Sequence, residues 1–325
     1  MPRLRRAGTL LGGCRLGGVG LRAARAGAGR GKTCRKANRM RTEEQHPRRV
    51  DLTSLSAEDL VNLVVEESRV AARAVETAAP QLIRVIKEVA NCYDRGGTTI
   101  YIGAGTSGRI AAMDAAEMPP TFGVAPERFV ALLAGGSYMR SAEGAEDDRQ
   151  RGRRDLDNVL RNIGPGDVPL HADAQPSQAR SPHLVIGVSA SGATPYVLAA
   201  LELARERNIF TVGIANNPNV PLVHLADHAV VLDTGPEILA GSTRMKAGTA
   251  QKIALNIVSL GAMAMCGRIT GDAMTHMTPV SEKLRQRAVR IVMSQRRCDA
   301  ETATRLLEQC EWVIARALSE DARLG

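Results

Sequence analysis

Two segments of this sequence share one pattern, in which a short apolar run leads into a turn of glycine, serine and threonine that opens a helix. The first turn spans residues 103–109 and the second spans residues 189–194. A helix N-terminus presents unpaired backbone N–H groups, and glycine lets an anion approach them while hydroxyl groups add donors. The two turns therefore predict a phosphorylated small molecule as ligand. Neither turn carries the lysine of a nucleoside triphosphate loop.

The first turn also fits the glycine pattern of a dinucleotide site, through Gly103, Gly105 and Gly108. A dinucleotide fold needs an acidic residue at the end of the next strand, where it holds the ribose. The next apolar run, about residues 128–133, ends in Ala134 and two glycines without a carboxylate. The context therefore disfavours a dinucleotide. A tight turn without a ligand stays open for either segment alone and is less favoured for both together.

Apolar runs that alternate with helical segments predict an α/β protein with a doubly wound parallel sheet. The predicted strands are residues 98–102, 129–133, 184–188, 210–214 and 229–232, and the predicted helices between them are residues 142–160, 195–207 and 246–265. A further helix runs from the first turn to about Glu117, where Pro119 and Pro120 end it. Ligands of such sheets bind beyond the carboxyl ends of the strands, where both turns fall.

Helical periodicity flanks the predicted sheet on both sides. Residues 56–89 predict two or three amphipathic helices with Ser56 as the first N-cap, and residues 280–292 and 299–318 predict a small helical appendage, with a helix start at Asp299. The sequence thus predicts four parts. They are a disordered basic extension at 1–39, an N-terminal helical segment at 40–88, the sheet domain at 89–268 and a C-terminal helical domain at 269–325.

The net charge of +9 comes from the N-terminal extension. Residues 1–39 hold eleven Lys and Arg and no acidic residue, so the rest of the chain is close to neutral. Arginine and glycine interrupt its apolar stretches, which predicts neither a signal peptide nor a membrane span. Aromatic residues make up 2% of the chain, which disfavours base stacking. We expect an extension of little role, with Met40 as an alternative start, and neither nucleic acid nor membrane as partner.

Cysteine and histidine residues give no metal-binding pattern. The six cysteines fall at no metal-ligand spacing, and without a secretion signal they favour a reducing cytoplasm. His224 and His228 are four residues apart, but no glutamate lies between them as in zinc proteases, so a structural role is favoured. We expect no metal and no other cofactor.

Three segments carry groups that could react or bind charge. Glu117 lies near the end of the helix that the first turn begins. Glu143, Glu146, Asp147 and Asp148 form an acidic cluster, for which a solvated helix face is the ordinary interpretation. Residues 241–249 place Arg244 and Lys246 at the start of an apolar helix, where cations oppose the helix dipole, so a bound anion is favoured there.

Six segments in order give a more specific indication. They are residues 102–110, 114–123, 134–136, 143–147, 189–196 and 241–252. Together they resemble the motif set of the N-acetylmuramic acid 6-phosphate etherase family, bacterial lyases of the sugar isomerase (SIS) fold. The resemblance covers roughly residues 50–318. It implies conversion of N-acetylmuramic acid 6-phosphate to N-acetylglucosamine 6-phosphate and D-lactate by a cytoplasmic homodimer that needs no metal.

The resemblance also implies two catalytic glutamates, which fall on Glu117 and Glu146. We expect Glu146 to act as the base at C2 and Glu117 as the acid toward the ether oxygen, although the reverse stays open. The expected phosphate ligands are five hydroxyl side chains, those of Thr106, Ser107, Ser189, Ser191 and Thr194. We expect Arg244 or Lys246 to meet the lactyl carboxylate or the enolate.

Three other classes of protein stay open beside the lyase. A sugar-phosphate-binding regulator, similar to the glucokinase regulator, would keep both turns but needs no catalytic carboxylates and would carry two SIS units, of which only one is visible here. An aldose–ketose isomerase would also remove a C2 proton but has no leaving group to protonate. A nucleic-acid-binding regulator would need a helix-turn-helix module, which the basic extension does not resemble.

Overall fold

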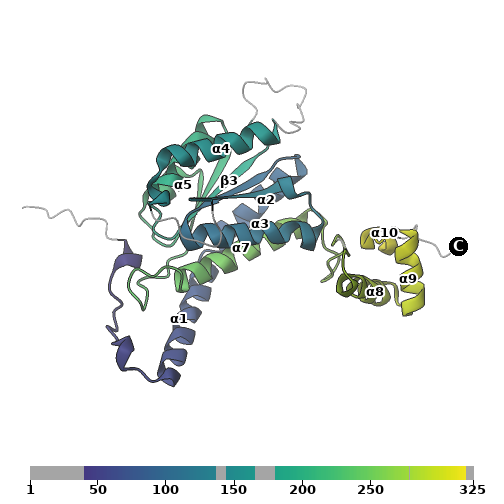
Figure 1. The fold of residues 1–325 in the computed structure, drawn as a ribbon, viewed down its shortest axis with the longest axis horizontal. Coiled ribbons are helices and arrows are strands. Elements are labelled where there is room, and N and C mark those ends of the chain that lie inside the picture. Colours follow the sequence, from purple (N-terminus) through teal and green to yellow (C-terminus); the bar gives the residue numbers. More distant parts are fainter. Residues whose placement is uncertain (1–39, 137–143, 165–179, 278, 320–325) are drawn as a thin grey trace, which may run out of the picture. The chain divides into compact units, whose positions relative to one another are not determined.

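A five-stranded parallel sheet forms the centre of the computed structural model, which describes residues 40–136, 144–164, 180–277 and 279–319 (Figure 1). The strands are β1 (Thr99–Gly103), β2 (Phe129–Leu133), β3 (Leu184–Ser189), β4 (Phe210–Ala215) and β5 (His228–Val231). All neighbouring strands pair in parallel, in the order β2-β1-β3-β4-β5. The predicted basic extension and Glu143 lie outside the described residues.

The side of β1 on which new strands are added changes after β2, while all strands stay parallel. The chain moves outward from β1 to β2 and then crosses back over β1 to β3, so the following strands extend the sheet on the other side. The register places Gly103 of β1 beside Val188 of β3, so these two strands end side by side. A reversal of this kind opens a crevice beyond the carboxyl ends of the strands, where ligands of α/β sheets bind. Both glycine turns start at this point.

Helices cover the sheet on both faces. One face carries α1 (Ala57–Thr77), α2 (Ala79–Asp94), α3 (Gly105–Phe122) and α7 (Lys246–Met265), and the other carries α4 (Arg149–Ile163), α5 (Pro195–Glu206) and α6 (Pro221–Leu225) (Figure 1). Side chains alternate along β1, since Tyr101 packs into the first core while Ile100 and Ile102 pack into the second. Because helices cover both faces, the strands are mostly apolar, as the sequence predicted. The predicted fold class is confirmed.

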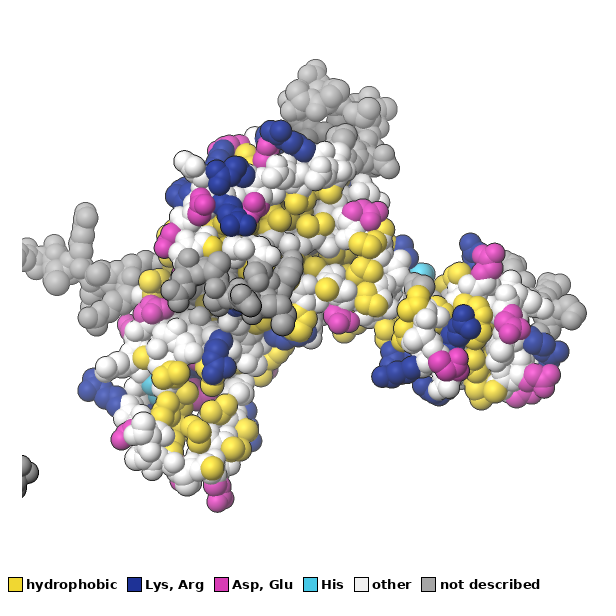
Figure 2. Space-filling model, viewed as in Figure 1, with side chains coloured by type: hydrophobic (Ala, Val, Ile, Leu, Met, Phe, Trp, Pro, Cys, Tyr) yellow, Lys and Arg dark blue, Asp and Glu magenta, His cyan; other side chains and the backbone are white. Residues whose placement is uncertain are grey.

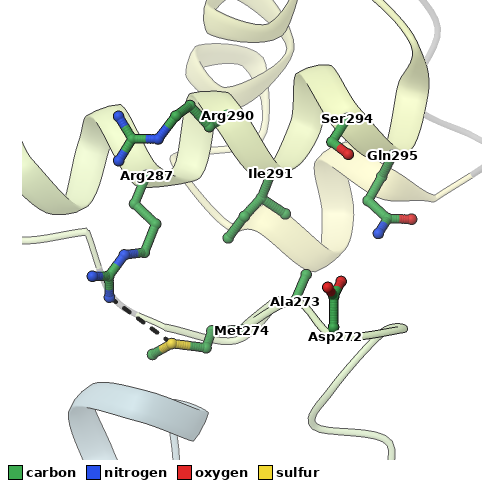
Figure 3. Close-up of a pocket in the computed structure, with 8 residues that line it drawn as sticks. All are labelled: Asp272, Ala273, Met274, Arg287, Arg290, Ile291, Ser294 and Gln295. Atoms are coloured by element: carbon green, nitrogen blue, oxygen red, sulfur yellow. Dashed lines mark hydrogen bonds between the residues drawn. The ribbon is translucent and has the colours of Figure 1, made fainter.

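The C-terminal helices have a core of their own. They are α8 (Glu282–Arg296), α9 (Ala300–Gln309) and α10 (Ile314–Leu318), packed around Val292, Leu307 and Ile314. A cavity of about 330 Å³ lies between α8 and the segment that precedes it, and Figure 3 shows Arg287 of α8 turned toward the sulfur of Met274, 3.9 Å away. The segment before α8 is therefore part of this helical unit.

Most predicted boundaries are confirmed, but α2 and α8 end five and four residues beyond their predictions. Three further elements differ from prediction. Each strand lies within one residue of its prediction, and the side chains of Ser56 and Asp299 cap their helices. The predicted helix at 142–160 is instead a short 3-10 turn, η4 (Ala145–Asp147), followed by α4. The predicted helix at 299–318 is divided into α9 and α10, because Glu311 and Trp312 take left-handed φ angles of 53° and 60°.

The third difference concerns the end of α3. This helix continues through Pro119 and Pro120 to Phe122, so the prediction that the prolines end it was wrong. Proline in the last turns removes N–H donors without blocking the turn that follows it. The helix ends at Gly123, which has a left-handed φ of 60° and donates its N–H to the carbonyl of Pro119. No helix of the described residues is long and apolar enough to cross a membrane.

Candidate functional site

Backbone packing shapes the first glycine turn. A Cβ on Gly103 would lie 2.6 Å from the Cα of Gly108, and a Cβ on Gly108 would lie 2.7 Å from the carbonyl oxygen of Gly103. Only glycine at both positions lets the start of α3 approach the end of β1 this closely. Gly105 has open space around it but a left-handed φ of 53°. Thr106 and Ser107 follow it in the first turn of α3, so both predicted ligands lie at the carboxyl edge of the sheet.

Hydroxyl groups shape the second glycine turn. The Ser189 hydroxyl lies 2.7 Å from that of Thr194 and accepts a hydrogen bond from the Gly192 N–H at 3.0 Å. The Ser191 hydroxyl lies 3.3 Å from that of Ser189 and accepts from the Ala193 N–H at 3.2 Å. The three predicted hydroxyl ligands of this turn are therefore gathered in one place, just before the first residue of α5.

The start of α7 lies next to the first glycine turn. A Cβ on Gly248 would be 3.2 Å from the Cγ2 of Thr106, so residues 241–249 reach the same edge of the sheet as both turns. The buried carboxylate of Glu237 caps this helix, accepting hydrogen bonds from the N–H groups of Lys246 at 3.2 Å and Ala247 at 2.9 Å. Burial raises the pKa of Glu237, and these two N–H donors oppose the shift.

The two cations of residues 241–249 have different surroundings. The Lys246 ammonium is buried and hydrogen-bonds the carboxylate of Glu67 on α1 at 2.5 Å, whereas Arg244 is exposed. Glu67 thus pairs with the ammonium of Lys246, and Glu237 caps the start of α7. The bound anion predicted at this helix start stays a prediction. Arg244, Lys246 and Thr249 line a cavity of about 160 Å³ beside them.

Sequence reasoning missed both Glu67 and Glu237. Glu237 lies nine residues before a helix whose first residues are basic, and a carboxylate that caps such a helix could have been sought there. Glu67 lies on a helix 179 residues from Lys246, and no local pattern indicates that pair. Both residues are therefore findings of the structure.

Glu146 lies near the second glycine turn. It is exposed in η4, which packs against α5. Gly152, in the first turns of α4, packs against the carbonyl of Tyr196 at the start of α5, where a Cβ would come within 2.2 Å. Since η4 precedes α4 and Thr194 precedes α5, Glu146 and the second turn lie at the same end of this helix pair.

Glu117 lies at the other end of the sheet from the turn that begins its helix. It comes twelve residues after Gly105 in α3, which corresponds to about 18 Å along the axis. One turn earlier, Asp114 accepts hydrogen bonds of 3.1 Å from the Tyr101 hydroxyl on β1 and the Ser259 hydroxyl on α7. Glu117 is exposed beyond this buried anchor. A single chain therefore places Glu117 toward the amino edge of the sheet and Glu146 at the carboxyl edge.

Comparison with known proteins shows the family to which this chain belongs. The chain is 44% identical over 280 residues to the N-acetylmuramic acid 6-phosphate etherase of Deinococcus radiodurans, which covers 86% of each chain. It is 39% identical over 283 residues to the etherase of Symbiobacterium thermophilum, which covers 86% of this chain and 88% of that protein. The chain belongs to the N-acetylmuramic acid 6-phosphate etherase family.

Two domain families also match this etherase-family chain. The SIS domain family matches residues 171–261, and the N-terminal SIS domain of glucokinase regulatory protein matches residues 81–205. The second match includes both glycine turns and both candidate glutamates. Within the described part of this etherase-family chain, no three His, Cys, Asp or Glu side chains gather as a metal site would require.

Proposed function

We propose that this protein acts in the cytoplasm as a homodimer that cleaves the lactyl ether of N-acetylmuramic acid 6-phosphate. The products are N-acetylglucosamine 6-phosphate and D-lactate. One observation carries the proposal: in a chain of the etherase family, two hydroxyl-bearing helix starts follow neighbouring strands at the point where the strand order reverses. This arrangement suits the phosphate of a sugar, because two helix N-termini converge on one anion.

The phosphate is held by the five hydroxyl side chains of the two turns, Thr106, Ser107, Ser189, Ser191 and Thr194. The register of β1 and β3 supports this assignment, because it brings the two turns to adjacent strand ends. Arg244 or Lys246 binds the lactyl carboxylate. The exposure of Arg244 favours it, since the ammonium of Lys246 is already paired with Glu67.

The reaction proceeds on the open-chain aldehyde. Glu146 takes the proton at C2, which the neighbouring carbonyl acidifies, and the electrons of that bond form a C2–C3 double bond. The bond from C3 to the ether oxygen breaks, and lactate leaves with a proton from Glu117. Water then adds to C3 and gives a proton to Glu117, while Glu146, whose proton has exchanged with solvent, protonates C2. General acid and base catalysis of this kind contributes about 10²- to 10⁴-fold to each step. The opposite assignment of the two glutamates fits the same chemistry.

A second subunit is needed to complete this site. Glu117 lies about 18 Å along α3 from the turn at its own start, so we assign the acid to Glu117 of the partner subunit. The helices on the α3 side of the sheet expose apolar side chains, among them Val61 and Val65 of α1, Ile83 of α2 and Leu260 of α7. Figure 2 shows hydrophobic side chains gathered over α1.

A groove on this face supports the pairing of two copies. It lies between α1, α2 and α7, has a volume of about 310 Å³ and is lined almost entirely by apolar side chains such as Leu82 and Ile253. Contiguous exposed apolar surface of this kind marks protein interfaces, and a two-fold axis would let each subunit cover the face of the other.

The reaction is tested by incubating the protein with N-acetylmuramic acid 6-phosphate in deuterated water. Release of lactate with deuterium at C2 of the sugar supports elimination followed by water addition. The variants Glu117→Gln and Glu146→Gln are expected to lose turnover while retaining binding. A fully active double variant would refute the assignment. Tight binding without turnover in the unaltered protein would instead favour the regulator, the alternative that the match to glucokinase regulatory protein supports.

A further inference from the structure

The first described residues of the chain lie over the carboxyl edge of the sheet. We call residues 40–46 the strap. Three of the seven strap residues are exposed and three are half-buried, but Thr42 is completely buried. A buried polar side chain must find partners within the protein, so its contacts show what the strap is bound to.

A single asparagine connects Thr42 to the second glycine turn. The Thr42 N–H donates to the Asn217 Oδ1 at 3.2 Å, and the Asn217 Nδ2 donates back to the Thr42 Oγ1 at 3.0 Å. The same Nδ2 donates to the carbonyl oxygen of Ala190 at 2.9 Å. Asn217 is 1% exposed, and Ala190 lies between the two serines of the turn. Thr42 therefore orients the amide that holds the backbone of this turn.

The consequence for the turn follows from the planarity of the peptide bond. The Ala190 carbonyl also accepts a hydrogen bond from the Asn216 N–H at 3.1 Å, so two donors fix its direction. In a trans peptide the next N–H, that of Ser191, points opposite to the carbonyl. Holding the Ala190 carbonyl toward Asn217 thus directs the Ser191 N–H away from the strap, which fixes one of the donors of the proposed phosphate site.

Both ends of the strap are anchored to other parts of the same edge. Arg41 forms an ion pair with Asp233, which follows β5. His46 lies 3.3 Å from the carboxylate of Glu67, and both side chains are largely buried. Glu67 is the residue that pairs with Lys246 at the start of α7. The strap therefore connects the second glycine turn with the helix start beside the first one.

We propose that Thr42 is a positioning residue for phosphate binding, acting through Asn217 on the backbone of the second glycine turn. This inference rests on the proposed function, since it takes that turn to be the phosphate site. It predicts that loss of the Thr42 hydroxyl weakens the hold on the sugar phosphate and leaves the chemical step in place.

The test compares Thr42→Val and Thr42→Ser in the full chain. Three constants are measured for each: kcat and KM with N-acetylmuramic acid 6-phosphate, and the Kd of N-acetylglucosamine 6-phosphate by calorimetry. Loss of one neutral hydrogen bond predicts that Thr42→Val raises KM and Kd about three- to tenfold, with kcat within about twofold of the unaltered protein. Thr42→Ser keeps the hydroxyl and is expected to restore both values. Thr53→Val, at an exposed threonine of the same N-terminal segment, is the matched control.

The outcomes separate this inference from the lyase proposal. If the protein binds N-acetylglucosamine 6-phosphate but releases no lactate, the lyase proposal fails and the Kd of Thr42→Val still decides the role of Thr42. A purely structural role would lower the melting temperature and leave KM and Kd unchanged, which overturns the inference, as does a protein that binds no sugar phosphate. If Thr42→Val does not fold, Thr42→Ala takes its place with the same criterion.

Discussion

The two halves of the sheet edge hold their glycine turns by different means. At β1 the turn is held by backbone packing between Gly103 and Gly108, while at β3 it is held by the hydroxyls of Ser189, Ser191 and Thr194. The helices that follow also differ in what they carry. The helix after β1 carries Glu117 toward the amino edge of the sheet, whereas Glu146 lies near the turn that follows β3. Similar sequence patterns thus build two differently supported turns, and under the proposed function only the β1 half takes its glutamate from a second subunit.

Mixing two inactive variants tests this difference with the largest expected effect. Glu117→Gln and Glu146→Gln, each expected to lose about 10²- to 10⁴-fold in kcat, are unfolded and refolded together. If each site takes its two glutamates from different subunits, half of the random dimers hold one intact site, and about a quarter of the original activity returns. The measurement is the rate of lactate release.

The control for this experiment is each variant refolded alone. If both glutamates of a site came from one chain, every site in a mixed dimer would lack one of them. Activity that stays at the level of the single variants after mixing would therefore contradict the shared site.

Substitutions in the first turn test the role of backbone packing. In Gly108→Ala the new Cβ would lie 2.4 Å from Leu133 Cδ1 and 2.7 Å from the backbone of Gly103, so we expect a loss of about 3 kcal/mol in the free energy of unfolding. In Gly105→Ala the Cβ meets open space and only the left-handed φ is strained, so about 1 kcal/mol is expected. Urea denaturation measures both. Equal losses would show that close packing does not set this turn.

The anchor of α3 gives a prediction about pH. Burial raises the pKa of Asp114 to about 6, against which its hydrogen bonds from Ser259 and Tyr101 and the charge of Lys252 act. Because the folded carboxyl binds its proton more tightly than the unfolded one, stability falls as pH rises from about 4 to 6. The variant Asp114→Asn cannot ionise at this position. Its free energy of unfolding is therefore expected to fall by about 2 kcal/mol less than that of the unaltered protein as pH rises.

Denaturant titrations of Asp114→Asn between pH 4 and pH 8 measure this effect. Asp272→Asn, at an exposed carboxylate, serves as the control and is expected to follow the unaltered protein. An unchanged pH dependence in Asp114→Asn would show that this buried carboxyl does not set the stability of α3.

Removal of residues 1–39 is expected to have the smallest effect. The predicted extension carries the excess positive charge and none of the candidate site residues, so a chain that begins at Met40 should keep kcat and KM within about twofold. Kinetics of the shortened and full-length proteins provide the comparison. A large change in KM would show that the extension takes part in binding.

The sequence predicted the sheet well because its signals are local. Continuous apolar runs give buried parallel strands, and the bounds of α7 agree with the prediction, since an apolar stretch follows a polar turn there. The end of α3 was not predicted, because the helix continues through Pro119 and Pro120 and ends only at Gly123, which has a left-handed φ. The longer helix leaves Glu117 at the same distance from the turn at the start of α3.

The contacts that organise the candidate site were beyond the reach of sequence patterns. Glu67 pairs with Lys246, which lies 179 residues away in the sequence, and Thr42 forms hydrogen bonds with Asn217, which lies 175 residues away. Such pairs depend on which strands become neighbours, and neither Thr42 nor Glu67 lies in a motif that suggests chemistry. The glycine turns were predicted from their residue types, whereas Glu117 and Glu146 were proposed as catalytic because six ordered segments resemble the etherase family.

The separation of Thr42 and Asn217 also bears on how the protein is made. Thr42 leaves the ribosome long before β4, yet its partner follows that strand, so the pair cannot form until 175 more residues have been synthesised. Closing so long a loop is slow relative to the local helices and adjacent strand pairs. The edge that would hold the substrate therefore depends on parts of the chain made far apart in time, whereas a local helix such as α1 can form soon after its own residues are made.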